Sequence, residues 1–487
     1  MSFLKGAFFL VGLKSLNSGT GFLISFFVVI VLGANETTDA LFVAMFFPIE
    51  MIRMVARRLP LVLVPVFTES YQNSDLDPEP HFLGWWMPLL LIVTMVLVFM
   101  APILTKLMAP GLSSAGYATA VNLLRILAPS FLLFGIFGHG MSIFYYHKMI
   151  LFPEIPLFAW RLTALLSLFL AGYAFGVYGY AVGLILAGCI QFFVLYLKGR
   201  ANGWSLLSMK KPNFKWPYLK LILAGFALVV VALVLNRTSA LIDRWFASLL
   251  GAGSISILFL SERLARSVPI LLSTSLFTLY LPKLSSIAKQ TDKMDSLRLE
   301  MFSFFMIIGL PISILFFWAA GDLVHILATY GRFTDAQVMS AVAVIQYFCM
   351  GIPAVICSAG LRNVFIVERN IKEIFLFGML TVALTLVLDF ALLGMGLKGL
   401  ALASTITAWM IFFLLWIRLK MSFPPGKYVI NILVSSFLML LFLFGLPWKN
   451  WEIMPLIRLG LGCVGGLFLY CITIIPISSQ IRTHISN

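Results

Sequence analysis

The sequence predicts an all-α polytopic membrane protein of about fourteen transmembrane helices, built as two six-helix lobes plus two C-terminal helices. Three observations support this fold class. The 487 residues are 61% hydrophobic and only 11% charged, and the mean hydropathy is +1.03. Soluble domains carry roughly 25% charged residues. Long apolar stretches recur along the whole chain, and its first half matches its second half.

A membrane-spanning helix needs roughly 20 predominantly apolar residues. The first apolar stretch is expected to be a span and not a removed signal peptide, because no small-residue cleavage site follows a short apolar core. The expected spans are residues 6–32, 40–69, 84–108, 119–147, 151–175, 178–197, 217–249, 254–284, 299–327, 336–366, 373–394, 398–417, 428–446 and 454–475.

Lysine and arginine predict the orientation, because they are enriched in cytoplasmic loops. Placing the N-terminus in the cytoplasm puts seventeen of these residues in inner loops and ends. Only Arg332, Lys398 and Lys449 then fall outside. Both termini are therefore expected in the cytoplasm. The protein itself is expected in a bacterial cytoplasmic (inner) membrane. The net charge of +15 follows mainly from this topology, so it does not indicate nucleic-acid binding.

The loops are too short for a soluble catalytic domain, so an enzyme is not expected. The longest loop, 198–216, is basic and is expected to lie on the lipid surface. The five cysteines lie in apolar segments without metal-ligand spacing, so they are expected to pack as small hydrophobic residues. The expected parts are 1–200, the N-terminal lobe; 201–216, a cytoplasmic linker; 217–420, the C-terminal lobe; and 421–487, the last two helices and a tail.

An internal repeat appears at an offset near 220 residues. "VLGANETTDALF", which contains Gly33, corresponds to "LLGAGSISILFL", which contains Gly251. Later, "GVYGYAVG" at 176–183 corresponds to "GLKGLALA" at 396–403. Each repeat holds six spans, so both copies have the same orientation and a pseudo-two-fold axis along the membrane normal is expected. Substrate sites in such transporters lie between the repeats.

Arginines within the apolar spans are the main functional signal. Arg53 and Arg57 are one helical turn apart, with Arg58 beside them, and the second repeat places Arg263 and Arg266 similarly. Exposing an arginine to lipid costs roughly 2.5–3.5 kcal/mol, so a hydrated cavity between the lobes is expected. Guanidinium binds phosphate bidentately, which favours a phosphate-bearing anion as cargo. The alternative is that these arginines only pair with carboxylates such as Glu50 and Glu262. Lys14, with Asn17 and Ser18, would add the first helix to the cavity.

The segments "GANETTDALFVAMFFP", "SERL…LPKLS" and "YGRFTDAQ" resemble the MurJ (MviN) family of the multidrug/oligosaccharidyl-lipid/polysaccharide exporter superfamily. The resemblance extends from about residue 5 to 475. It implies an alternating-access flippase for lipid II, the peptidoglycan precursor of the cell wall, with a cationic cavity built from helices 1, 2, 7 and 8.

The resemblance also implies site residues. Asp39 matches the acid of the family's "TDA" motif, Arg53 matches an arginine of helix 2, and Glu262 and Arg263 match an acid–arginine pair on helix 8. The chain departs from the family where helix 1 typically carries two arginines, because Ser18 and Ile24 stand there. It departs again at Ile52 and at Arg57-Arg58, which replace an arginine and a Glu-Gly pair.

Some MurJ-like proteins bind sodium in the C-terminal lobe, and Asp243, Asp389 and Thr405 are the candidate ligands here. The alternative is that Asp243 pairs with Arg244 or Arg237. Sodium or protons are candidate coupling ions, and no other cofactor is expected.

The leading hypothesis is a monomeric flippase for an undecaprenyl-pyrophosphate-linked glycan, with lipid II first. The alternatives are a flippase for another lipid-linked oligosaccharide and a cation-coupled drug exporter, which would need an acidic cavity. A membrane glycosyltransferase would need a larger outer loop.

Overall fold

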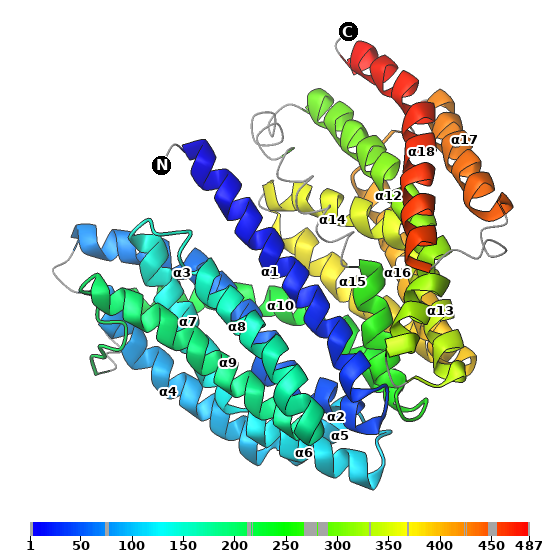
Figure 1. The fold of residues 1–487 in the computed structure, drawn as a ribbon. Coiled ribbons are helices and arrows are strands. Elements are labelled where there is room, and N and C mark those ends of the chain that lie inside the picture. The colour runs from blue at the N-terminus through cyan, green and yellow to red at the C-terminus, as the bar shows by residue number, and fades with distance from the viewer. Residues whose placement is uncertain are drawn as a thin grey trace. The chain divides into compact units, whose positions relative to one another are not determined.

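The structure is a computed structural model in which long helices account for nearly every described segment (Figure 1). No strand occurs among the described residues, so the all-α class is confirmed. Chain contacts divide the protein into two compact units, 1–256 and 257–487, each described by itself. The described residues are 3–73, 77–211, 216, 218–266, 280, 291–330, 333–367, 370–422, 424, 426–446 and 455–485.

The N-terminal unit contains the helices expected for the first six spans, and several spans are broken into two. A π-helical segment, η1, interrupts the second span, and a second one, η2, interrupts the fifth. Its elements are α1 Phe3–Leu32, α2 Glu36–Ala44, η1 Phe46–Met51, α3 Ile52–Asn73, α4 Pro78–Phe99, α5 Ala101–Met108, α6 Ser114–Leu127, α7 Pro129–Tyr146, α8 Glu154–Ser167, η2 Leu168–Gly172, α9 Tyr173–Ala201 and α10 Leu219–Ser248.

The C-terminal unit follows a helix at 254–266 that begins in the first unit. In it α17 and α18 run beside each other and against α12 (Figure 1). Its elements are α12 Thr291–Tyr330, α13 Asp335–Met350, α14 Ile352–Val367, α15 Ile371–Leu392, η3 Leu393–Met395, α16 Leu397–Arg418, α17 Gly426–Gly445 and α18 Pro455–Ile485.

Helix covers most of every expected span where the structure describes it, with short breaks such as that at Gly351. Residues 217, 267–279, 281–284 and 454 of the expected spans lie outside the described residues. Among the described helices, seven are long and apolar enough to cross a membrane, or eight if the bent pair Asp335–Met350 and Ile352–Arg362 counts as one span. The count of fourteen stays a prediction. The lobe boundary expected at 217 also stays a prediction. Chain contacts place α10, which packs on α3, in the first unit.

Paired glycines give the two halves the same local backbone. Gly33 and Gly251 follow the ends of corresponding helices with φ of 84° and 103°. Gly176 has φ 61° and ψ −146°, and Gly396 has φ 67° and ψ −147°. These are regions that glycine enters without a Cβ clash. The repeat found in the sequence therefore holds at the level of backbone torsion angles.

A second glycine pair serves close helix approach. A Cβ added at Gly179 would lie 2.2 Å from the carbonyl oxygen of Ala171, and one added at Gly399 would lie 2.0 Å from that of Leu392. Each glycine thus lets a helix start directly against the end of the preceding one. The shared G-x-x-G spacing, Gly176 to Gly179 and its counterpart, is explained by one turn residue and one contact residue.

Candidate substrate and ion sites

The arginines of the second span lie on α3, directly after the π-helical segment. The guanidinium carbon of Arg53 lies 4.0 Å from the ring centroid of Trp160 and 5.8 Å from that of Phe134. Both rings are buried, and Arg53 is half-buried. Arg57 and Arg58, one turn further on, are exposed. A cation over an aromatic face is attracted by the ring quadrupole, and a guanidinium has donors enough to bind an anion as well.

The first helix meets α8 through polar contacts. The Asn17 amide donates to the carbonyl oxygen of Glu154 at 3.1 Å and to its carboxylate at 2.9 Å. One turn along α1, a Cβ added at Gly21 would lie 2.6 Å from a guanidinium nitrogen of Arg161, so the glycine makes room for that side chain. Ser18, on the same helix, is half-buried. The side chain of Lys14 lies outside the described residues.

Asp39 lies at the start of the helix at 254–266. Its carboxylate is 1% exposed and accepts hydrogen bonds from the backbone N–H of Gly253 and of Ser256, both at 2.7 Å, and from the Ser256 hydroxyl. A carboxylate that satisfies the free N–H groups at a helix start is a helix cap. Both oxygens are engaged and buried in this arrangement. The substrate role that the resemblance implies for Asp39 stays a prediction.

Glu50 also has a partner that the sequence did not indicate. Its carboxylate accepts from Nη2 of Arg244 at 2.9 Å through both oxygens, and Nη1 of Arg244 donates to the carbonyl of Phe42 at 3.3 Å. Glu50 therefore binds α10 to the second span, and the pairing with the α3 arginines that the sequence left open is not the one observed. Arg237, on the same helix, donates from Nε to the Met54 sulfur at 3.1 Å.

The charged site residues expected in the second repeat, Glu262, Arg263 and Arg266, lie on the helix at 254–266. Nη1 of Arg266 donates to Glu262 at 2.9 Å with i,i+4 spacing, as the sequence alternative described. Arg263 is exposed and lies over Phe259, 5.5 Å from its centroid. A salt bridge with both partners about 30% exposed is weak, typically below about 1 kcal/mol. Arg266 is thus free to exchange Glu262 for a stronger anion.

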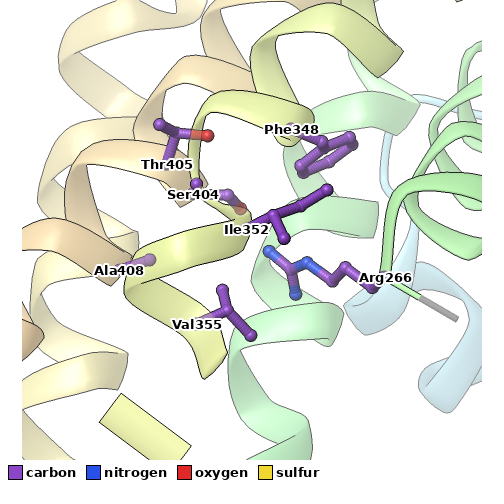
Figure 2. Close-up of a pocket in the computed structure, with 8 residues that line it drawn as sticks. Arg266, Phe348, Ile352, Val355, Ser404, Thr405 and Ala408 are labelled. Carbon is purple, nitrogen blue, oxygen red and sulfur yellow. The ribbon is translucent and has the colours of Figure 1, made fainter. Parts of the chain in front are cut away.

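Arg266 points into a small cleft (Figure 2). Its guanidinium lies 5.2 Å from the ring centroid of Phe348. The cleft has a free volume of about 10 Å³, enough for about one water molecule. The lining residues are Arg266, Phe348, Gly351, Ile352, Val355, Ser404, Thr405 and Ala408.

The same cleft borders the break between α13 and α14, which are bent by 43°. A broken helix leaves carbonyl groups without intrahelical donors. Here side chains of α12 and α16 supply the donors. The bonds are Ser313 to the carbonyl of Cys349 at 2.6 Å, Thr405 to that of Tyr347 at 2.7 Å and Trp409 to that of Met350 at 3.0 Å.

The three candidate sodium ligands are all buried: Asp243 is 6% exposed, Asp389 0% and Thr405 5%. Asp389 and Thr405 lie on α15 and α16, which pack together, whereas Asp243 belongs to the first unit. Buried carboxylate and hydroxyl oxygens are donors that a hard cation accepts. Among the described residues, no three His, Cys, Asp or Glu side chains form a group that could hold a metal. The sodium site stays a prediction.

Repeated bundles of long apolar helices, with guanidinium groups inside the spans, define a polytopic membrane transporter. The chain belongs to the MurJ family: the sequence profile described as "Lipid II flippase MurJ" matches residues 28–455. It is thus a multi-pass protein of the inner membrane in a family of transporters and not of catalytic enzymes.

Curated relatives carry the same name. The "Probable lipid II flippase MurJ" of Buchnera aphidicola subsp. Acyrthosiphon pisum is 25% identical over 444 residues, which are 87% of this chain and 86% of the relative. That of Thermotoga maritima is 24% identical over 413 residues, 82% of each chain.

Solved structures share the fold. "Lipid II flippase MurJ, inward closed conformation" aligns with a TM-score of 0.82 at 18% identity, covering 96% of this chain and 99% of that one. An inward-facing multidrug resistance MATE family transporter of the MOP superfamily aligns with a TM-score of 0.68 at 14% identity. The alignment covers 84% of this chain and 93% of that one. The likeness supports the superfamily fold expected from the sequence.

Proposed function

We propose that the protein moves an undecaprenyl-pyrophosphate-linked glycan, lipid II first, from the cytoplasmic to the periplasmic leaflet by alternating access. The family and its curated relatives support lipid II as the cargo. The observation that carries the anion-binding step is Arg53, held over Trp160 at 4.0 Å with Arg57 and Arg58 one turn away. Three guanidinium groups on one helix supply the bidentate donors that a pyrophosphate accepts.

We expect the charged and polar residues inside the spans to contact the cargo. Arg53, Arg57 and Arg58 in the first unit, and Arg263 and Arg266 in the second, would bind the pyrophosphate. Glu262 would release Arg266 when the cargo arrives, since the Arg266–Glu262 bridge is partly exposed. Ser18 and Lys14 would contact the cargo from α1. The lipid tail would stay in the bilayer, because moving it through a hydrated path would expose its apolar surface to water.

Complementation of a conditional lipid II flippase depletion tests this proposal. Wild type should restore growth, and an R53A/R263A variant of equal expression should not. R53K/R263K should restore it only partly, because lysine cannot bind bidentately. Rescue by the double alanine variant would overturn the role of the arginines. Failure of a well-expressed wild type would overturn lipid II as the cargo.

A flippase for another lipid-linked oligosaccharide is the second candidate. Ser18 and Ile24 stand where the family typically has arginines, and Arg57-Arg58 adds charge elsewhere. A displaced positive charge fits a pyrophosphate attached to a different glycan. Growth rescue separates the two, since only a lipid II flippase restores cell-wall synthesis.

We also propose that both termini are cytoplasmic, that the protein acts as a monomer without nucleic acid, and that sodium at Asp243, Asp389 and Thr405, or a proton, drives the return step. Cysteine labelling near each terminus tests the orientation.

For sodium, the melting temperature in NaCl should exceed that in KCl for wild type and not for D389N. An equal difference in both proteins would overturn the assignment.

A further inference from the structure

The chain after α9 is folded tightly onto the N-terminal unit. The indole of Trp204 stacks on His147 with centroids 4.1 Å apart and planes at 10°, and it meets Phe144 edge-on at 5.0 Å. Leu206 is 1% exposed. The backbone N–H of Lys210 donates to the carbonyl of Pro80 at 3.0 Å. This segment therefore has a fixed conformation.

That conformation turns a mixed apolar and basic set of side chains outward. Leu207 and Met209 are 41% and 54% exposed. Lys210 and Lys211, which follow Met209, are exposed, and so is Arg200 in the last turn of α9. These five residues are called the linker patch. None of its three cations forms an ion pair with a residue that the structure describes.

We propose that the linker patch is a binding surface for anionic glycerophospholipid headgroups of the leaflet at the C-terminal end of α9. The apolar tips of Leu207 and Met209 would enter the acyl boundary, and the three cations would meet phosphate groups. The stacked Trp204 and the buried Leu206 hold these side chains in place before a lipid arrives, which lowers the entropy cost of binding. The proposal does not depend on which glycan is transported.

Charge complementarity identifies the partner. A Lys or Arg near an anionic membrane surface contributes about 1 kcal/mol, so neutralising two lysines should weaken the binding of anionic lipid about 30-fold. A soluble acidic partner could meet the same cations, but it would leave Leu207 and Met209 in water. The exposed apolar pair therefore favours a lipid surface.

The experiment uses the full chain in nanodiscs of phosphatidylcholine with increasing phosphatidylglycerol, and native mass spectrometry counts the anionic lipids retained. Wild type should retain phosphatidylglycerol, and K210Q/K211Q should need about 30-fold more of it. The control is K106Q/K398Q, which removes the same charge from exposed positions outside the patch. L207S/M209S should also weaken retention, with all lysines kept.

Equal retention by K210Q/K211Q and wild type would overturn the proposal. So would equal losses in K210Q/K211Q and K106Q/K398Q, since net charge alone would then explain the effect. A soluble polyanion that raises the melting temperature in pure phosphatidylcholine discs as much as phosphatidylglycerol does would replace the lipid by a soluble acidic partner.

Discussion

The guanidinium of Arg53 and the indole of Trp160 form a cation–π interaction. The guanidinium carbon lies 4.0 Å from the ring centroid, and Trp160 is 3% exposed. The two residues come from α3 and α8, so the contact joins two different spans. It gives a charged side chain a fixed position inside an apolar unit. The cost of placing an arginine in a span is thereby reduced, since the ring face replaces part of its hydration.

Replacing Trp160 tests whether this contact positions Arg53. W160L should lower the stability of the protein by roughly 2–4 kcal/mol, because it removes a desolvated cation–π contact and leaves a cavity. W160F retains a ring face and should lose less. Growth rescue should follow the same order, W160F above W160L. Equal rescue at equal expression would show that Arg53 needs no aromatic support.

The Glu50–Arg244 pair predicts a strong asymmetry between single and double substitutions. The side chains are 15% and 8% exposed. E50Q should destabilise the protein by about 3–5 kcal/mol, since it leaves a buried guanidinium without its counter-charge. E50L/R244M should recover most of this loss. Thermal unfolding in detergent measures both.

The control for that pair is Arg298–Asp295, whose carboxylate is 53% exposed. D295N should change stability by less than about 1 kcal/mol, because water screens the exposed carboxylate. Equal effects of E50Q and D295N would contradict the structural role of Glu50.

Asp39 separates a helix cap from a substrate ligand. D39N replaces one acceptor oxygen by an N–H₂ donor that faces the N–H groups of Gly253 and Ser256, and it should cost about 1–3 kcal/mol of stability. S256A removes only a hydroxyl and should cost about 1 kcal/mol. Binding of a pyrophosphate-linked lipid by the folded fraction should be unchanged in both. A D39N protein with normal melting and lost binding would support the substrate role of Asp39 instead of the cap.

Equivalent glycines should respond alike to alanine. G176A and G396A each force a Cβ into backbone angles near φ 61–67° and ψ −147°, at about 1–3 kcal/mol. Both variants should therefore lower the melting temperature by a similar amount. Gly394 has no neighbour within 4 Å of an added Cβ and no positive φ, so G394A is the matched control and should be near neutral.

Much of the fold was predictable because it depends on local sequence. Apolar runs long enough to span a membrane form helices, since unsatisfied backbone groups are costly in lipid. The span expected at 299–327 lies within α12, and that at 398–417 within α16. The repeat was visible because Gly176 and Gly396 meet the same backbone requirement. The break at Gly351 was not predictable from local sequence. The carbonyl groups before it, of Tyr347 and Cys349, accept hydrogen bonds from Thr405 and Ser313, which lie on other helices.

Composition, periodicity and glycine spacing are properties of neighbouring residues. The helical class, the repeat and the presence of charge inside the spans could therefore be predicted from the sequence alone. The partners of Glu50 and Asp39, in contrast, depend on the tertiary structure. Glu50 meets Arg244 194 positions away, and Asp39 meets Gly253 214 positions away. Such pairs are set by how whole helices pack, and packing distance has no period in the sequence. In the fold Asp39 caps a helix start, and Glu50 forms an interhelical ion pair.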